Sequence, residues 1–495
     1  MNAAVNYFDL VKLVSPEIVV VVTALLVLGL GLTNKRKTSG SRLCSLAAVV
    51  GIAGAIVMVS MLPQEARLFG GMIVISPLTS LFKIICLVLA FFTVLLAHGQ
   101  KFLQNRGEYL AMLLLATVGL LLLVGSEELL MIFIGLELTG LSLYIMTGFD
   151  KTDVRSAEAG LKYFLFGSTA SAFTLFGLSL VYGMSGATGL AAIAQKLSGA
   201  PVQPLLAAGL VMTLVGLAFK VAAAPFHLWA PEAYQGGPIS SAAFIASGSK
   251  VASFFVLGKI VLIGFGPLAG SAAWHAMAAG WVPALAALAA LSILLGNLVA
   301  LVQSNVRRLL AYSAVAHAGY TLLGLVAGGP DGFRATLFYT TIYAFTLVGA
   351  FGVVALVRRE TGGDDLKNFS GLWARSPLAA ACMTIFLLSL AGLPPLAGFF
   401  GKFYLFSAAL RSGQSHGLLW LVILALFGSL ISLYYYLIVL KVIFTDQKPS
   451  AGTTSPASLP RDPWQQASLA ALAAIVLFLG LNPASLVSRI SATLP

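Results

Sequence analysis

Long apolar runs succeed one another along almost the whole chain, and no other feature of the sequence constrains the fold as strongly. Because an α-helix rises about 1.5 Å per residue, a run of about 20 apolar residues is long enough to cross a bilayer. Only 9% of the 495 residues are charged, whereas soluble domains carry roughly 25%. The composition therefore excludes a water-soluble globule, and the runs predict an all-α membrane protein.

Cutting the apolar runs at charged or Gly/Pro-rich breaks predicts fourteen transmembrane helices. The first run is followed by Asn34-Lys35-Arg36-Lys37, a stop-transfer pattern, and it lacks the basic leader of a cleavable signal. The expected spans are 16–33, 42–61, 77–98, 109–124, 127–147, 157–184, 203–226, 238–264, 276–303, 308–328, 333–357, 376–409, 415–443 and 465–487.

The basic residues between these spans predict how the helices are oriented. Counted loop by loop, 17 Lys and Arg residues fall on the side of the loop after the first span, and six fall on the opposite side. Because loops rich in Lys and Arg stay in the cytoplasm, both termini are expected outside. The six basic residues of the outer side are Lys12, Arg67, Lys196, Arg334, Arg411 and Arg489.

A weak internal repeat divides the chain. Residues 127–137 align without gaps on residues 307–317, and the tetrapeptide at 172–175 recurs at 344–347. Five helices, an odd number, separate the two copies, so the copies must have opposite orientations in the membrane, as in many transporters. The expected units are a three-helix segment at 1–108, five-helix repeats at 109–263 and 281–443, and a C-terminal helix at 464–495.

Proline interrupts two of the predicted helices at matching places in the two repeats. The seventh span runs into Ala224-Pro225-Phe226-His227, and the twelfth is cut by Gly392-Leu393-Pro394-Pro395. Proline removes a backbone donor and frees a carbonyl, which then needs a partner from protein or water. We therefore expect helices 7 and 12 to be discontinuous, with a hydrated cavity beside each break.

Three lysines and one glutamate lie deep inside predicted spans. A charge at the bilayer centre costs at least about 2.5–3.5 kcal/mol, so such residues face the bundle interior and mark ion or proton paths. A buried lysine can release and regain a proton, whereas arginine stays charged. We therefore predict that Glu137, Lys220, Lys250 and Lys402 carry protons, with Glu137 electrostatically coupled to Lys220.

Two further titratable residues fit the same path less directly. In the predicted register, His317 is the repeat counterpart of Glu137, and an imidazole suits a proton relay between the two repeats. The alternative is a hydrogen-bonded core histidine. Lys162 lies five residues inside the sixth span, where it either joins the path or snorkels to the cytoplasmic surface.

The remaining polar residues have simpler interpretations. Lys83 and Lys259 lie near the outer ends of their spans and are expected to snorkel, and the 358–375 loop is expected to be solvated surface. His227 and Glu232 flank the cytoplasmic end of the first break and are candidates for proton entry. Cys44, Cys86 and Cys382 are isolated, flanked by apolar residues and not part of a CxxC motif, so they are expected to be buried thiols. The sequence contains no metal-ligand spacing, dinucleotide fingerprint or nucleophile triad.

These residues resemble a known family. The segment 219–236, with its stretch Phe226-His227-Leu228-Trp229-Ala230-Pro231, is similar to subunit N of bacterial NADH:quinone oxidoreductase, respiratory complex I. Ser249-Lys250, Glu137 and Gly392-Leu393-Pro394-Pro395 extend the resemblance to nearly the whole chain. The related L and M subunits and the Mrp-type sodium/proton antiporters share the two inverted repeats but differ in the first segment.

The resemblance implies a membrane-arm subunit that translocates protons while NADH oxidation and quinone reduction occur elsewhere in the complex. No cofactor is then expected in this chain, and FMN, iron-sulfur clusters and quinone belong to other subunits. The expected partners are the K-, J- and M-type neighbours in a bacterial inner membrane, with periplasmic termini and no nucleic acid despite a net charge of +12. The residues that match the family's polar axis are Glu137, Lys220, Lys250, Lys402, Lys162 and His317.

Two alternatives remain open. One is a subunit of a Mrp-type sodium/proton antiporter, which works without a redox arm. The other is a scaffold that has lost pumping and only joins its neighbours. The ionisable residues inside the spans argue against the scaffold, and the segment 219–236 argues against the antiporter.

Overall fold

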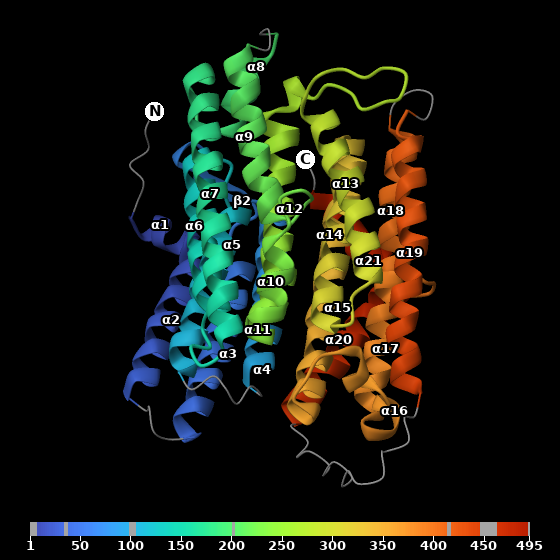
Figure 1. The fold of residues 1–495 in the computed structure, drawn as a ribbon. Coiled ribbons are helices and arrows are strands. Elements are labelled where there is room, and N and C mark those ends of the chain that lie inside the picture. Colours follow the sequence, from blue (N-terminus) through green and yellow to red (C-terminus); the bar gives the residue numbers. More distant parts are fainter. Residues whose placement is uncertain are drawn as a thin grey trace.

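The computed structural model describes residues 7–33, 38–98, 105–199, 203–412, 417–445 and 463–493. Helices dominate this part of the chain and run side by side in a single bundle (Figure 1). Twelve of them are long and apolar enough to cross a membrane. The prediction of an all-α membrane protein is confirmed.

Eleven of these twelve helices are single elements: α2 (Ser15–Thr33), α3 (Thr38–Ser60), α4 (Pro77–His98), α5 (Arg106–Val124), α6 (Leu129–Thr147), α7 (Val154–Ser185), α13 (Trp281–Leu301), α14 (Val306–Ala327), α15 (Gly329–Thr361), α19 (Leu419–Phe444) and α20 (Pro463–Leu481). The twelfth, Ile239–Gly264, combines α11 (Ile239–Phe244) and α12 (Lys250–Lys259) with two π-helical segments, Ile245–Ser249 and Ile260–Gly264. Wider π-helical turns inside α-helices are frequent at functional sites.

The two spans predicted to be discontinuous are broken helices. The seventh span contains α9 (Pro204–Lys220), and α10 (Trp229–Gly236) follows beyond its predicted end; the twelfth consists of α17 (Pro377–Ala391) and α18 (Ala397–Arg411). Each of the fourteen predicted spans overlaps a helix in the part of the chain that the structure describes, and twelve of these helices are long and apolar enough to cross a membrane. The ninth begins at Trp281, five residues later than expected, because a short bridge between Ser271 and Ala278 holds the preceding residues in a loop.

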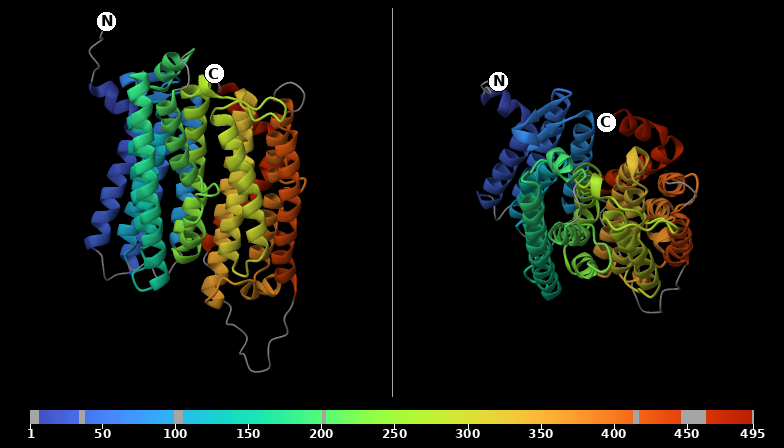
Figure 2. Two further views of the ribbon diagram at one scale, coloured as in Figure 1. Left: turned by 45° about the horizontal axis from the view of Figure 1, so that its top comes forward. Right: turned by 90° about the horizontal axis from the view of Figure 1, so that it is seen from above.

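Short elements lie at the ends of the bundle. The small helices are α1 (Tyr7–Leu13), α8 (Leu190–Leu197), α16 (Leu372–Arg375) and α21 (Ala484–Thr493). The two strands β1 (Ala66–Leu68) and β2 (Ile73–Ile75) pair antiparallel, with Arg67 opposite Val74. Viewed from above, the N-terminal helices and the C-terminal helices lie on the same side of the bundle (Figure 2).

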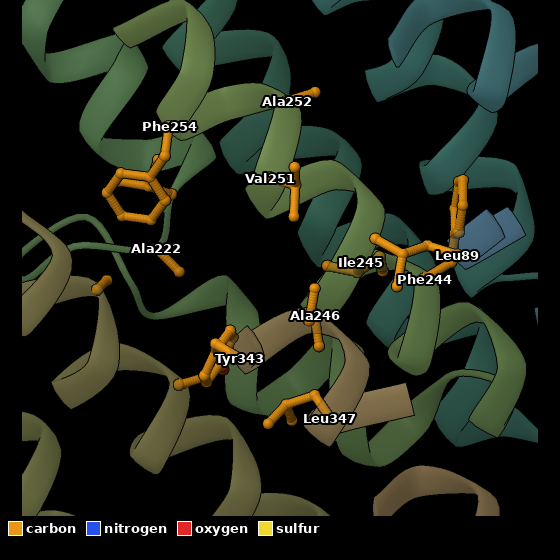
Figure 3. Close-up of a cluster of buried hydrophobic side chains, with 14 of the residues drawn as sticks. Leu89, Ala222, Phe244, Ile245, Ala246, Val251, Ala252, Phe254, Tyr343 and Leu347 are labelled. Carbon is orange, nitrogen blue, oxygen red and sulfur yellow. The ribbon is translucent and has the colours of Figure 1, made fainter. Parts of the chain in front are cut away.

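Helix α15 joins the two halves of the molecule. It packs against α11 and α12 from the first half and against α14, α17 and α18 from the second. A cluster of buried apolar side chains fills this junction, where Ile245 and Ala246 face Tyr343 and Leu347 of α15 (Figure 3). A buried, close-packed junction of this kind transmits displacement between the halves because interiors have low compressibility.

Side chains satisfy the backbone groups that the helix breaks leave free. After α9 ends at Lys220, the indole N–H of Trp229 donates to the carbonyl of Phe219 at 3.1 Å, and the N–H of Ala224 donates to Ser292 Oγ at 2.8 Å. Such partners are required where a helix is interrupted within a membrane. The breaks are therefore ordered parts of the fold.

Capping residues give the register of the internal repeat. Glu128 caps α6 and forms a bridge with Gly189, and Asn305 caps α14 and forms the same kind of bridge with Asp365. Aligning Glu128 with Asn305 shifts the second repeat by three residues relative to the alignment of 127–137 on 307–317. An apolar helical pattern nearly repeats itself every turn, so a slip of one turn preserves sequence similarity. His317 therefore lies about one turn beyond the counterpart of Glu137.

The segment at 358–375 is only partly the solvated surface that the sequence predicts, because three of its residues are buried. Asp364 is buried, forms ion pairs with Arg307 and with Arg358 at 3.2 Å, and accepts a hydrogen bond from Asn305 at 2.8 Å. Burial alone would raise the pKa of this carboxyl, but Arg307, Asn305 and Arg358 together hold the pKa below its ordinary value of 3.8. The loop is therefore anchored to the start of α14.

The lowered pKa of Asp364 predicts acid sensitivity. A carboxylate with a depressed pKa stabilises the folded state above its ordinary pKa and loses this contribution as the pH falls through the folded-state value. Asp364→Asn should lower the free energy of unfolding by about 1.5–3 kcal/mol at neutral pH, the typical strength of hydrogen bonds to charged groups. The difference from the unmodified protein should shrink below about pH 4.

Denaturant unfolding of the purified protein at a series of pH values measures this difference. Glu65→Gln, which changes an exposed carboxylate, is the matched control and should have little effect. A penalty for Asp364→Asn that stays constant down to about pH 3 would contradict the assigned electrostatic role.

Candidate functional site

The structure buries three of the lysines and the histidine that the sequence selected. Lys220 on α9, Lys250 at the start of α12, Lys402 on α18 and His317 on α14 are each 7% exposed or less. Glu137 on α6 is half-buried. None of the four buried side chains snorkels to a surface, so each must find its polar partners inside the bundle.

Lys220 and Glu137 line one small cavity of about 20 Å³, together with Tyr144 and Ser171. Ser171 Oγ donates to Glu137 at 2.5 Å, and Lys220 Nζ lies beside Gly140, one turn along α6. A cavity of this size holds the centre of one water molecule. The two charged residues therefore share a water-sized space, and no direct ion pair joins these two described side chains.

Lys250 lies where a π-helical segment passes into α12. Its Nζ donates to the carbonyl of Ala314 at 2.6 Å and lies 5.4 Å from the ring centroid of Tyr343. In the register set by the helix caps, Ala314 is the repeat counterpart of Glu137. Lys250 therefore contacts a neutral backbone carbonyl, whereas Lys220 lies near a carboxylate.

Lys402 binds the carbonyl that the second helix break leaves free. Its Nζ donates to the carbonyl of Ala391, the last residue of α17, at 2.9 Å, and to Ser429 Oγ at 2.8 Å. The ammonium lies 5.2 Å from the ring centroid of Tyr320. The proline break predicted in the twelfth span therefore supplies a ligand for the lysine that follows it.

His317 lies at the centre of a cluster of tyrosines. Its Nδ1 shares a hydrogen bond with the Tyr339 hydroxyl at 2.6 Å, and its Nε2 shares one with the Tyr436 hydroxyl at 3.1 Å. The rings of Tyr343 and Tyr320 have centroids 5.0 and 5.6 Å from the imidazole. Since Tyr343 also contacts Lys250 and Tyr320 contacts Lys402, His317 lies between the two lysines.

Reasoning from the sequence missed these tyrosines. Tyr320 accepts from the side-chain amide of Asn297 at 2.9 Å, and Tyr435 donates to the same amide group at 3.2 Å. A buried tyrosine hydroxyl needs a polar partner, so the run Tyr434-Tyr435-Tyr436 inside an apolar span was an available signal.

Comparison with known proteins identifies the family. The family described as the transmembrane region of NADH:quinone oxidoreductase/Mrp antiporter matches residues 126–432. NADH-quinone oxidoreductase subunit N 2 of Acidobacterium capsulatum is 46% identical over 97% of this chain and 98% of its own length. The chain belongs to the subunit N family of NADH-quinone oxidoreductases. The predicted resemblance is confirmed.

Solved structures share this fold. A chain of respiratory complex I from Thermus thermophilus has a TM-score of 0.78 at 33% identity, over 97% of this chain and 100% of that one. A chain of the Mrp complex from Dietzia sp. DQ12-45-1b has a TM-score of 0.78 at 21% identity, over 97% and 96% of the two chains. At the lower identity the likeness concerns the fold alone.

Lys162 lies apart from the buried residues of this subunit N family member. Its side chain is 39% exposed and forms ion pairs with Glu158 at 2.5 Å and with Glu232 at 3.4 Å. Glu232 also binds Arg308 at 3.0 Å. His227 is buried, and its Nδ1 has no hydrogen-bond partner among the described residues. These side chains gather near α10, which follows the first helix break.

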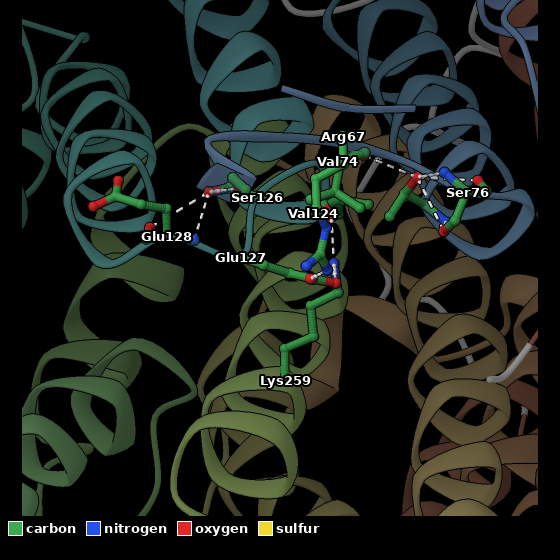
Figure 4. Close-up of polar contacts among 10 residues, drawn as sticks. Arg67, Val74, Ser76, Val124, Ser126, Glu127, Glu128 and Lys259 are labelled. Atoms are coloured by element: carbon green, nitrogen blue, oxygen red, sulfur yellow. Dashed lines mark hydrogen bonds and ion pairs between the residues drawn. The ribbon is translucent and has the colours of Figure 1, made fainter. Parts of the chain in front are cut away.

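Lys83 and Lys259 do not snorkel, so that interpretation is wrong. Lys83 is 2% exposed and pairs with Glu17 at 2.6 Å, and Lys259 is 4% exposed and pairs with Glu127 at 3.2 Å. Arg67 reaches the same Glu127 from β1 (Figure 4). The acidic partners are far away in the sequence, Glu17 on α2 and Glu127 in the connection between α5 and α6, which is why the apolar pattern around each lysine did not reveal them.

The pair Glu17–Lys83 generates a prediction about stability. Lys83→Met should destabilise the fold by about 3–5 kcal/mol, because it leaves a buried carboxylate without its cation. The double variant Glu17→Gln/Lys83→Met should recover most of this loss, since it removes both charges. Thermal unfolding of the detergent-purified protein measures both effects.

Lys196→Met is the matched control for the loss of a positive charge, because Lys196 is exposed. It should leave the unfolding temperature nearly unchanged. Equal destabilisation of the single and the double variant would show that packing of the lysine side chain, and not its charge, supports the fold.

Proposed function

We propose that this chain translocates protons as a membrane-arm subunit of NADH:quinone oxidoreductase. NADH oxidation and quinone reduction would take place in other subunits, which would also hold the FMN, the iron-sulfur clusters and the quinone. The observation that carries the proposal is the row of buried Lys, His and Tyr side chains that runs from Lys250 to Lys402 at the second helix break, with Lys220 buried at the first. Such groups are costly in a membrane protein and are retained where ions or protons move.

The residues take different roles in this proposal. Glu137 and Lys220 load a proton through the cavity that they share. Lys250 holds a proton at the centre of the chain against the carbonyl of Ala314. Lys402 releases it toward the outer side after a change in the local field. Each lysine can change its protonation state, whereas an arginine in its place would stay charged.

His317 connects Lys250 with Lys402 in this scheme. Dry hydrocarbon does not conduct protons, so a titratable or hydrated link is needed between the two lysines. The Tyr343 hydroxyl has no hydrogen-bond partner among the described residues, and its ring contacts both Lys250 and His317. We assign Tyr343 to the Lys250 side of the relay and Tyr436 to the far side.

Proton entry is assigned to the cytoplasmic end of the first break. Lys162, Glu232 and the unpaired nitrogen of His227 are the ionisable groups there. This assignment uses the orientation in which both termini are periplasmic, in a bacterial inner membrane, with K-, J- and M-type subunits as neighbours. Co-purification of the chain with those subunits and with flavin-containing subunits tests the assembly.

A second candidate is a sodium/proton antiporter subunit. The family match, which names the Mrp antiporter beside the oxidoreductase, favours it. The two functions differ in what drives transport. Proton release that depends on NADH and quinone, and not on a sodium gradient, supports the first, whereas co-purification with other antiporter subunits only would support the second. If neither NADH oxidation nor a sodium gradient drives proton release, the chain would be a scaffold subunit that does not transport protons.

Lys250 provides the first test of the mechanism. Both Lys250→Ala and Lys250→Arg should lower NADH-driven proton pumping several-fold, because alanine removes the titratable group and arginine keeps its charge. Pumping is measured in proteoliposomes that contain the assembled complex. Lys196→Ala, at an exposed position, is the control. An unchanged rate of proton pumping by an assembled complex that carries Lys250→Ala would contradict the proposal.

The bridge at His317 provides the second test. Tyr436→Phe removes only the hydroxyl that binds Nε2 and should slow pumping, and combining it with His317→Gln should add little further loss, since coupled residues are not additive. Tyr434→Phe is the matched control, because Tyr434 is 63% exposed on the same helix. Fully additive losses would indicate that the two residues act separately.

A further inference from the structure

A pocket of about 290 Å³ opens at one end of the bundle, between α15, α18 and α21. Figure 1 shows the three helices close together in its right-hand half. The polar lining consists of Asp331, Arg334, Ser407 and Arg411. The apolar lining consists of Ala335, Phe338, Phe403, Tyr404, Ala408 and Val487. Two guanidinium groups therefore lie above an apolar floor.

Arg334 and Arg411 both have guanidinium N–H groups that are not used by the contacts among the described residues. Arg334 donates to Ser491 Oγ at 2.8 Å and pairs with Asp331, which uses two of its five N–H groups. Arg411, the last residue of α18, is exposed, and no ion pair joins it to another side chain in the part of the chain that the structure describes. Two cations face one carboxylate, so the mouth of the pocket is positively charged.

The position of the arginines fits the headgroup layer of a bilayer. Helix α15 has 33 residues, so at about 1.5 Å per residue it is longer than the roughly 30 Å hydrocarbon core. Arg334 lies in the second turn of α15 and Arg411 at the end of α18. Both guanidinium groups therefore lie near the boundary between hydrocarbon and water, and Phe403, 53% exposed, points to the outside of the bundle.

The charge distribution singles out this pocket. The outer side has only six Lys and Arg residues, and three of them, Arg334, Arg411 and Arg489, belong to the three helices that form the pocket. The tendency to keep basic residues off the outer side makes such a concentration costly. Orientation alone does not account for it.

We propose that this pocket binds the phosphate headgroup of an anionic phospholipid, with an acyl chain lying along Phe403 and Val487. Guanidinium groups bind phosphate oxygens in a bidentate manner, and basic pockets between membrane helices bind anionic headgroups. The apolar floor favours a lipid over a soluble phosphate ion. A bound lipid would tie the outer end of α18, the helix of Lys402, to α15. The proposal does not depend on proton translocation.

Photo-crosslinking tests the lipid site in the assembled complex. A phosphatidylglycerol probe with a photoreactive acyl chain should label peptides of α15, α18 and α21 in the unmodified protein. A phosphatidylcholine probe should label them several-fold less. Arg411→Ala should lower labelling by the anionic probe about fivefold, the effect of one basic residue near an anionic lipid, and Arg411→Lys should retain most of it. Mass spectrometry of the labelled peptides quantifies each yield.

Three outcomes would overturn the proposal. They are equal labelling by the two probes, unchanged labelling in Arg411→Ala, and loss of labelling when inorganic phosphate is added, which would assign the pocket to a free anion. Lys196→Ala is the control for the loss of an exposed basic residue on the outer side and should leave labelling unchanged. The comparison of the two probes needs no variant, so it remains decisive if a variant fails to assemble.

Discussion

The cost of placing charge inside a membrane protein governs this structure. An ammonium group deprived of water must receive protein oxygens, and a regular helix has few to offer because its carbonyls already accept hydrogen bonds. The break after α17 frees the carbonyl of Ala391, and Lys402 binds it. The helix break and the buried lysine therefore depend on each other. The lysine donates a hydrogen bond to the free carbonyl, and the carbonyl lowers the cost of burying the ammonium group.

Neutral tyrosine hydroxyl groups, and not further charged side chains, surround His317 between the two halves of the molecule. Tyr339 and Tyr343 lie one turn apart on α15, and both contact His317. A tyrosine supplies a hydrogen-bonding group at the end of an apolar ring, so it costs less to bury than an ion. Because α15 also forms the packed junction between the halves, a shift of this helix would move the tyrosines relative to Lys250 and Lys402 together.

The sequence predicts features that are encoded locally and fails for those that depend on distant neighbours. The spans, the two breaks and the burial of Lys220, Lys250 and Lys402 follow from apolar runs, proline and isolated charges. The partner of Lys83 could not be found in this way, because Glu17 lies 66 residues away on another helix. The predicted register of the internal repeat is wrong for a related reason. A shift by one helical turn conserves the apolar pattern on which the alignment depends.

The partners of the buried lysines separate two kinds of site. Lys83 and Lys259 each contact a carboxylate, so each ammonium belongs to a buried ion pair that joins two distant parts of the chain. Lys250 and Lys402 contact only carbonyl and hydroxyl oxygens, which bind the charged form without neutralising it. A proton can leave such a lysine without stranding a buried anion. The chemistry of the partner, more than burial itself, therefore distinguishes lysines suited to proton transfer from those that hold helices together.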